Sequence, residues 1–224
     1  MFSVIACIRD NHDWRLVIAA AIVCLVGSLT TMLLLFRAQE CDAGQRKLWI
    51  ATSAFACGVG VWATHFIAML AYDGGMPISY DLGLTFLSVF LSIFGAWVAI
   101  LIASEGRSYS FAFGGVLMAL GIMAMHMTGM QAIEAQAIVV YDAFMSVVAF
   151  CSCGALATLH FLAFFKLKGM KRFAASSGAF VLAICTLHFI SMSSIALVLD
   201  ATREVPAMTL QPQVLAVIVM AVAT

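Results

Sequence analysis

The chain has 224 residues, of which 64% are hydrophobic and only 10% charged, and its acidic and basic side chains balance. A soluble domain carries roughly 25% charged residues, so this composition excludes a soluble protein and indicates an integral membrane protein. Nothing in the charge pattern suggests a nucleic-acid partner.

The charged residues are clustered and leave long uncharged runs between them. A membrane-spanning helix needs about 20 mostly apolar residues, whereas membrane β-barrels give short alternating segments. We therefore predict one all-α membrane domain over residues 1–224, with helices at about 14–36, 48–72, 81–104, 109–133, 142–165, 173–199 and 210–224 or beyond. Few apolar residues follow Pro212, so the chain is expected to be cut inside or just after the seventh helix.

Lysine and arginine predict the orientation of this seven-helix bundle. Eight of the eleven basic residues follow the first, third and fifth helices: Arg37, Arg46, Lys47, Arg107, Lys166, Lys168, Lys171 and Arg172. Basic loops stay in the cytoplasm, so the N-terminus is predicted to lie outside and the C-terminus, after seven spans, in the cytoplasm.

The even-numbered helices share a histidine motif. They contain WATHFIAM (62–69), AMHMTGM (124–130) and TLHFISM (186–192), and the motif histidines are 61 and 62 residues apart. Residues i and i+4 lie on one helix face, so each motif pairs an imidazole with a thioether. The three pairs are His65 with Met69, His126 with Met130, and His188 with Met192.

The odd-numbered helices repeat as well, because they begin at His12-Asp13, Tyr80-Asp81 and Tyr141-Asp142. We interpret the chain as three tandem two-helix repeats plus a final helix, with Asp81 and Asp142 as helix N-caps. His65 and His126 each lie eight residues before the next acidic residue, roughly 12 Å along a helix. His188 lies twelve residues before Asp200, which places it deeper or on a helix that projects further.

Three in-register His-Met pairs predict a shared site. Imidazole suits copper, zinc and iron, and a thioether selects Cu(I), so copper is the favoured ion. The simpler alternative to a shared site is that duplication copied a histidine whose role is only to pack inside the bundle. Met123 is a reserve ligand and Cys185 a thiol that could join, whereas Met125 and Met127 are predicted to point elsewhere. We expect His12 to be solvated rather than to cap the site, and His160 to be an interfacial or capped histidine.

Three histidine motifs on alternate helices resemble the MHYT domain, a bacterial membrane sensor module. Met125-His126-Met127-Thr128 matches its Met-His-Tyr-Thr motif at three of four positions. The other copies, Thr64-His65-Phe66-Ile67 and Leu187-His188-Phe189-Ile190, keep the histidine and an aromatic neighbour but lack the preceding Met, a proposed family ligand. The resemblance extends over essentially the whole chain.

The resemblance implies a bacterial inner-membrane sensor with a copper site near the periplasmic side. The signal that this sensor detects would be copper itself, a diatomic gas (O2, CO or NO) or the redox state. The resemblance also implies a cytoplasmic output domain after the last helix, for cyclic-di-GMP turnover, a kinase reaction or DNA binding, and hence a homodimer. None of these outputs lies in the 224 residues, so this domain is not expected to be an enzyme.

Two other functions remain open from the sequence. A haem protein needs two axial histidines on facing helices, which three equivalent histidines fit less well. A soft-metal transporter or channel could pass ions along histidine and methionine, although the inner halves of the helices show no matching polar residues.

Overall fold

A computed structural model describes residues 2–200, 202, 206 and 209–223. Within these residues the helices are α1 (Phe2–Asp10), α2 (Trp14–Glu40), α3 (Ala43–Ala71), α4 (Leu82–Ala103), α5 (Ser108–Gln131), α6 (Ala143–Lys166), α7 (Gly169–Met192) and α8 (Pro212–Ala223). The short strands are β1 (Ser79–Tyr80), β2 (Ile133–Glu134), β3 (Ala137–Tyr141) and β4 (Ile195–Leu199).

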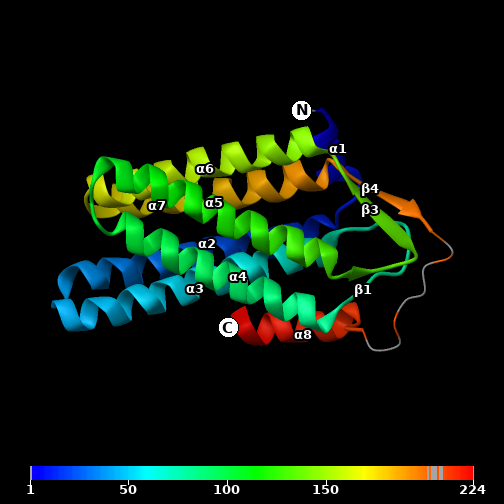
Figure 1. The fold of residues 1–224 in the computed structure, drawn as a ribbon, viewed down its shortest axis with the longest axis horizontal. Coiled ribbons are helices and arrows are strands. Elements are labelled where there is room, and N and C mark those ends of the chain that lie inside the picture. The colour runs from blue at the N-terminus through cyan, green and yellow to red at the C-terminus, as the bar shows by residue number, and fades with distance from the viewer. Residues whose placement is uncertain (1, 201, 203–205, 207–208, 224) are drawn as a thin grey trace.

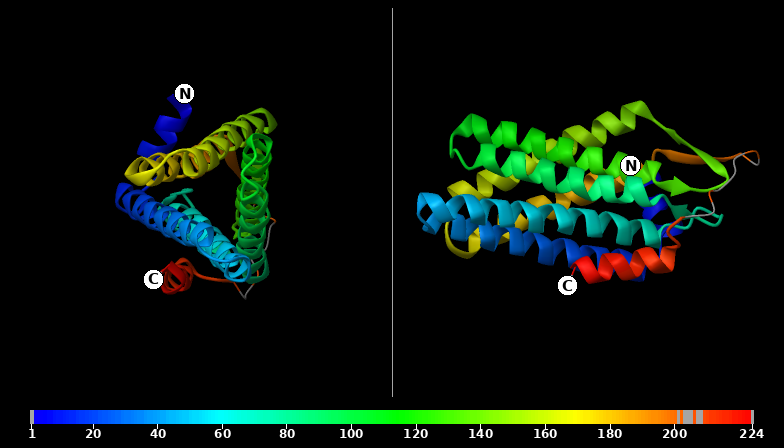
Figure 2. Two further views of the ribbon diagram at one scale, coloured as in Figure 1. Left: turned by 90° about the vertical axis from the view of Figure 1, so that its left-hand side faces the viewer. Right: turned by 60° about the horizontal axis from the view of Figure 1, so that its bottom comes forward.

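Three antiparallel helix pairs form the bundle: α2 with α3, α4 with α5, and α6 with α7. Viewed along the bundle axis, the pairs lie along the three sides of a triangle (Figure 2, left). Packing of α3 on α4, α5 on α6 and α2 on α7 closes the ring. The predicted arrangement of three tandem two-helix repeats is therefore the arrangement of the fold.

The two ends of the bundle differ in chemistry. At one end, the strand end, β1 pairs with β2 and β3 with β4, and α1 and the start of α8 lie nearby (Figure 1). The opposite end, the basic end, holds the connections α2–α3, α4–α5 and α6–α7 with their lysines and arginines. This division matches the charge asymmetry of the sequence.

Aspartates begin the first helix of each pair at the strand end. The side chains of Asp13, Asp81 and Asp142 accept hydrogen bonds from the backbone N–H groups of Arg15, Leu84 and Met145. Such a bond satisfies one of the four N–H groups that have no partner inside the helix. The predicted N-caps at Asp81 and Asp142 are confirmed.

Six helices, α2 to α7, are long and apolar enough to cross a membrane. Their outward faces carry large apolar side chains, as on α4, where Phe86, Phe90 and Phe94 are exposed. This is the surface expected of helices in lipid, where packing against the bundle buries only one face.

The predicted sixth helix needs correction, and the predicted seventh corresponds to the short helix α8. The sixth, predicted over 173–199, ends at Met192, because Ser193 and Ser194 form a turn and residues 195–199 pair with β3 instead. The seventh, predicted over 210–224 and beyond, is α8, whose 12 residues cover roughly 18 Å at 1.5 Å per residue. That is shorter than the about 30 Å hydrocarbon core of a bilayer. Helix α1 and the four strands were not predicted.

Candidate metal centre

The three motif histidines meet inside the bundle near its strand end. His65 lies on α3, His126 on α5 and His188 on α7, respectively six, five and four residues before each helix ends. All three are buried, with at most 5% of the side chain exposed. His188 is therefore no further from the end of its helix than the other two, and the extra residues before Asp200 form β4.

The imidazoles face one another through their Nδ1 atoms. Nδ1 of His65 lies 3.3 Å from Nδ1 of His188 and 3.3 Å from Nδ1 of His126. The ring centroids are 5.0, 5.4 and 5.5 Å apart. A tetrahedral ion that binds imidazole nitrogen at about 2.0–2.1 Å holds two such nitrogens roughly 3.3–3.4 Å apart. The spacing of the three rings fits a single transition-metal ion.

Hydrogen bonding among the three rings does not satisfy them. A neutral imidazole has one N–H donor and one lone pair, so Nδ1 of His65 can bond only one of its two neighbours. Among the residues that the structure describes, the Nε2 atoms of all three rings are buried without a partner. Each buried polar group left in this state costs about 1–3 kcal/mol. A cation bound by the three Nδ1 lone pairs would satisfy the Nδ1 atoms, and each Nε2–H would then still need an acceptor.

A cavity of about 60 Å³ lies against the three imidazoles. One water molecule needs roughly 10–15 Å³ of such volume, so the cavity is large enough for a diatomic molecule. Its other walls are mostly apolar or soft and include Ala20 and Ala21 of α2, Met125 of α5 and Cys185 of α7.

The predicted methionine ligands do not line this cavity. Met69, Met130 and Met192 are buried in the core, and Met69 lines a separate cavity with Tyr72 and Pro212. Their ligation stays a prediction.

Met125 and Cys185 do line the histidine cavity. The prediction that Met125 points elsewhere is wrong, because the rotation of α5 turns this neighbour of His126 inward. The Met-His dipeptide of the motif was the available signal. Met123, the predicted reserve ligand, is half-buried against the core and does not line the cavity.

Glycine brings α5 against the first ring. A Cβ added at Gly129 would lie 2.5 Å from Nε2 and 3.0 Å from Cδ2 of His65. Any side chain at this position would displace the imidazole. Gly129 therefore fixes how closely α3 and α5 approach at the centre.

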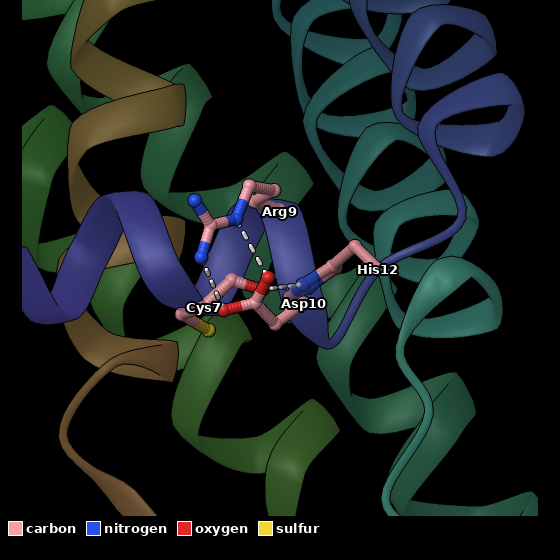
Figure 3. Close-up of polar contacts among 4 residues, drawn as sticks. All are labelled: Cys7, Arg9, Asp10 and His12. Atoms are coloured by element: carbon pink, nitrogen blue, oxygen red, sulfur yellow. Dashed lines mark hydrogen bonds and ion pairs between the residues drawn. The ribbon is translucent and has the colours of Figure 1, made fainter.

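His12 is buried rather than solvated, contrary to the sequence-based expectation. It lies in the turn between α1 and α2 with 8% of its side chain exposed, and its Nδ1 donates to the carbonyl of Cys7 at 2.9 Å (Figure 3). Helix α1, which was not predicted, supplies this carbonyl. Burial raises the pKa of the Cys7 thiol, and burial, Cys7 and Asp73 raise that of the Tyr72 hydroxyl. Both neighbours of His12 are thus uncharged at neutral pH.

His160 lies on α6 toward the basic end, away from the other histidines. Its Nδ1 donates to the Ser176 carbonyl of α7 at 2.9 Å, and its ring packs on Phe161 and Phe180. The predicted interfacial position is wrong, because the residue is buried inside the bundle between α6 and α7.

Comparison with known proteins agrees with this arrangement. The sequence profile of MHYT, described as a bacterial signalling protein N-terminal repeat, matches residues 58–115 and 120–176. Each match contains one motif histidine, His65 or His126, whereas His188 lies outside both. The structure places His188 with the other two. No solved structure gave a significant match.

Relatives are longer signalling proteins. An uncharacterized signaling protein of Caulobacter vibrioides is 36% identical over 208 residues, which are 92% of this chain and 26% of the relative. Two proteins of Pseudomonas aeruginosa also match. The bifunctional diguanylate cyclase/cyclic di-GMP phosphodiesterase MucR is 34% identical over 59% of this chain and 20% of its own length. The cyclic di-GMP phosphodiesterase NbdA is 37% identical over 43% and 12%.

The chain thus spans about a quarter or less of the length of these relatives. Its six long apolar helices and the two profile matches identify a multi-pass membrane protein. The chain belongs to the MHYT family of bacterial signalling domains.

Proposed function

We propose that this chain is a sensory input domain that binds one copper ion through His65, His126 and His188. The observation that carries the proposal is the 3.3 Å spacing of the Nδ1 atoms, which hydrogen bonds among the three rings cannot all satisfy. Three neutral nitrogens in an apolar, soft-walled site suit copper chemistry. No carboxylate belongs to the cluster of candidate ligands in the described part of the chain.

A thioether would complete the donor set. Met69, Met130 and Met192 remain candidates from the repeat, and Met125 joins them because it lines the histidine cavity. Thioether sulfur prefers Cu(I), whereas Cu(II) prefers nitrogen and oxygen donors. The three imidazoles would bind the ion in both oxidation states and so link α3, α5 and α7. The contact between the ion and the methionine would weaken when Cu(I) is oxidised to Cu(II).

The signal would be a diatomic gas (O2, CO or NO) or the redox state of the ion. The cavity beside the imidazoles has room for such a ligand, and its apolar wall favours a small uncharged molecule. A change at His188 would pass along α7 and β4 to α8, which packs on α3. The cyclic-di-GMP enzymes among the relatives suggest a cytoplasmic output of the same kind. A homodimer is part of the same proposal.

The membrane topology belongs to the same proposal. The strand end would face the periplasm and the basic end the cytoplasm, in agreement with the positive-inside rule. Helix α8 starts at the strand end and runs back along the bundle toward the basic end (Figure 1). The copper site then lies near the periplasmic side of the inner membrane.

Elemental analysis tests the copper proposal directly. Purified protein should carry copper, and the triple variant His65→Ala, His126→Ala, His188→Ala should carry none. The single variant His160→Ala, which removes a buried imidazole elsewhere, is the matched control and should keep its copper. Unchanged copper in the triple variant would contradict the proposal.

The same samples separate the two rival functions. The three rings are in contact and the cavity is small beside the roughly 300–1,000 Å³ of ordinary cofactor pockets, so no macrocycle fits between them. A Soret band in the absorption spectrum would nevertheless establish haem. Copper uptake into liposomes would favour a transporter. Spectral shifts of the copper-loaded protein on addition of NO or CO are expected of a gas sensor.

A further inference from the structure

His12 is a fourth buried imidazole beside the three-histidine cluster. Its turn is fixed to the end of α3, because Asp13 N–H donates to the Ala71 carbonyl and Asp73 N–H to the Asn11 carbonyl, at 2.8 and 2.9 Å. The His12 ring centroid lies 5.4 Å from that of Tyr72, 5.5 Å from Phe189 and 6.4 Å from His188. This ring is held by α1, α3 and α7 together.

The hydrogen bond from His12 to α1 decides which ring nitrogen can accept. The Cys7 carbonyl can only accept, so Nδ1 of His12 carries the proton and Nε2 of the neutral ring keeps its lone pair (Figure 3). Among the described residues, Nε2 of His12 is buried without a hydrogen-bond partner. An acceptor in this state is expected to face a donor.

His188 offers the matching donor. Its Nδ1 belongs to the cluster, 3.3 Å from Nδ1 of His65, and its Nε2 is also buried without a partner in the described structure. When the Nδ1 lone pair of a histidine binds an ion, its remaining proton sits on Nε2. Ligand histidines commonly donate this second N–H to a nearby acceptor, which fixes the ring and raises its basicity.

The ring distances separate a ligand from a supporting residue. Two imidazoles on one tetrahedral ion have centroids roughly 5.2 Å apart, as the three cluster rings do. His12 lies 6.4 Å from His188, and its nitrogens are not in the group of ligand atoms that lie within 4.8 Å of one another. A gap of this size suits a hydrogen bond through one water, or a direct one after a shift of about 1 Å.

We infer that Nε2 of His12 accepts the Nε2–H of His188, directly or through water, and so positions the His188 ring in the cluster. The inference rests on the proposed metal centre, in which His188 is a ligand. The same contact joins α1 to α7, so a rearrangement of His188 would reach the N-terminal helix.

Metal-free protein labelled with 15N-histidine tests the contact without copper. The wild-type protein should show His12 with a protonated Nδ1 and an unprotonated Nε2. The variant His12→Phe keeps a ring against Tyr72 and Phe189 but removes both nitrogens. It should shift the 15N signals of His188, which are assigned by their loss in His188→Gln. Unchanged His188 signals would overturn the inference.

Competition of Cu(I) against a chromophoric chelator tests the effect on the ion. His12→Phe should weaken Cu(I) binding by about 10–100-fold, the usual effect of losing such a partner, with unchanged copper at saturation. His12→Gln, whose amide oxygen can accept from His188, should restore part of the affinity. His160→Phe is the matched control and should leave the affinity unchanged.

Each outcome of this titration has one meaning. Equal affinities for His12→Phe and wild type, or a lower saturation level in the variant, would overturn the positioning role. Failure of wild type to bind copper would instead overturn the proposed function, and the metal-free 15N shifts would still decide whether His12 contacts His188.

Discussion

Two groups of buried histidines occupy opposite parts of the bundle and differ in how their nitrogens are satisfied. Near the basic end, His160 is 1% exposed, and its Nδ1 bonds the Ser176 carbonyl. Near the strand end, His65, His126 and His188 are equally buried, yet their Nε2 atoms have no partner in the described structure. Burial is common to both groups. What distinguishes the strand-end group as a site is that its Nδ1 atoms converge at 3.3 Å while its Nε2 atoms have no partner among the described residues.

The largest expected effect separates the two groups by metal affinity. His65→Gln should weaken Cu(I) binding by more than the about 10–100-fold caused by loss of an outer-shell partner, because Nδ1 of His65 contacts both other rings. His160→Gln should bind as wild type does. Chelator competition measures both. Equal losses in the two variants would mean that the copper affinity reflects the general state of the bundle.

Substitution of two glycines, one beside the histidines and one away from them, extends the comparison to the helix backbone. Gly129→Ala should push the His65 ring out of register, since the added Cβ lies 2.5 Å from its Nε2. Overpacking of this kind costs about 1–3 kcal/mol and should lower copper affinity as well as stability. Gly178→Ala on α7 meets nothing within 4 Å and is the control, with affinity unchanged. Normal copper binding by Gly129→Ala would show that the rings adapt.

The positions of the histidines were predictable, whereas their surroundings were not. Spacings of 61 and 62 residues place His65, His126 and His188 at one level on parallel helices, because the repeat fixes both helix direction and length. The pattern of residues along a single helix does not determine how α5 is rotated about its axis relative to α3. For that reason the pattern did not predict that Met125 lines the cavity, nor that Gly129 touches His65.

The ends of the helices escaped prediction for a different reason. Residues 195–199 are apolar and could continue a helix by composition, but pairing with β3 satisfies their backbone groups and decides in favour of a strand. His12 looked solvated because α1, only nine residues long, is too short to be recognised as a span. Both errors concern tertiary contacts at the strand end.

In the metal-free protein, replacing His160 should lower the free energy of unfolding more than replacing a histidine of the strand-end group. His160→Leu should lower the free energy of unfolding by about 0.5–1.5 kcal/mol, because the Ser176 carbonyl of α7 loses the hydrogen bond from the His160 ring. His126→Leu should be neutral or stabilising without metal, since it removes a polar group that has no partner at Nε2. Thermal unfolding in detergent measures both. A large loss in His126→Leu would indicate that the rings stabilise the apoprotein.

The smallest effects concern residues that lie at the strand end but only shape it. Loss of an aspartate N-cap costs about 0.5–2 kcal/mol. Asp81→Ala should fall in the upper part of this range, because its carboxylate accepts from Leu84 N–H at 2.7 Å in a half-buried position. Asp142→Ala should fall in the lower part, because its bond to Met145 N–H is 3.0 Å long and exposed. Neither variant should change Cu(I) affinity, since each aspartate holds a helix start and neither touches the rings. A tenfold loss of affinity in Asp142→Ala would show instead that proximity to the strand end alone governs binding, and the distinction between unsatisfied and satisfied histidines would lose its force.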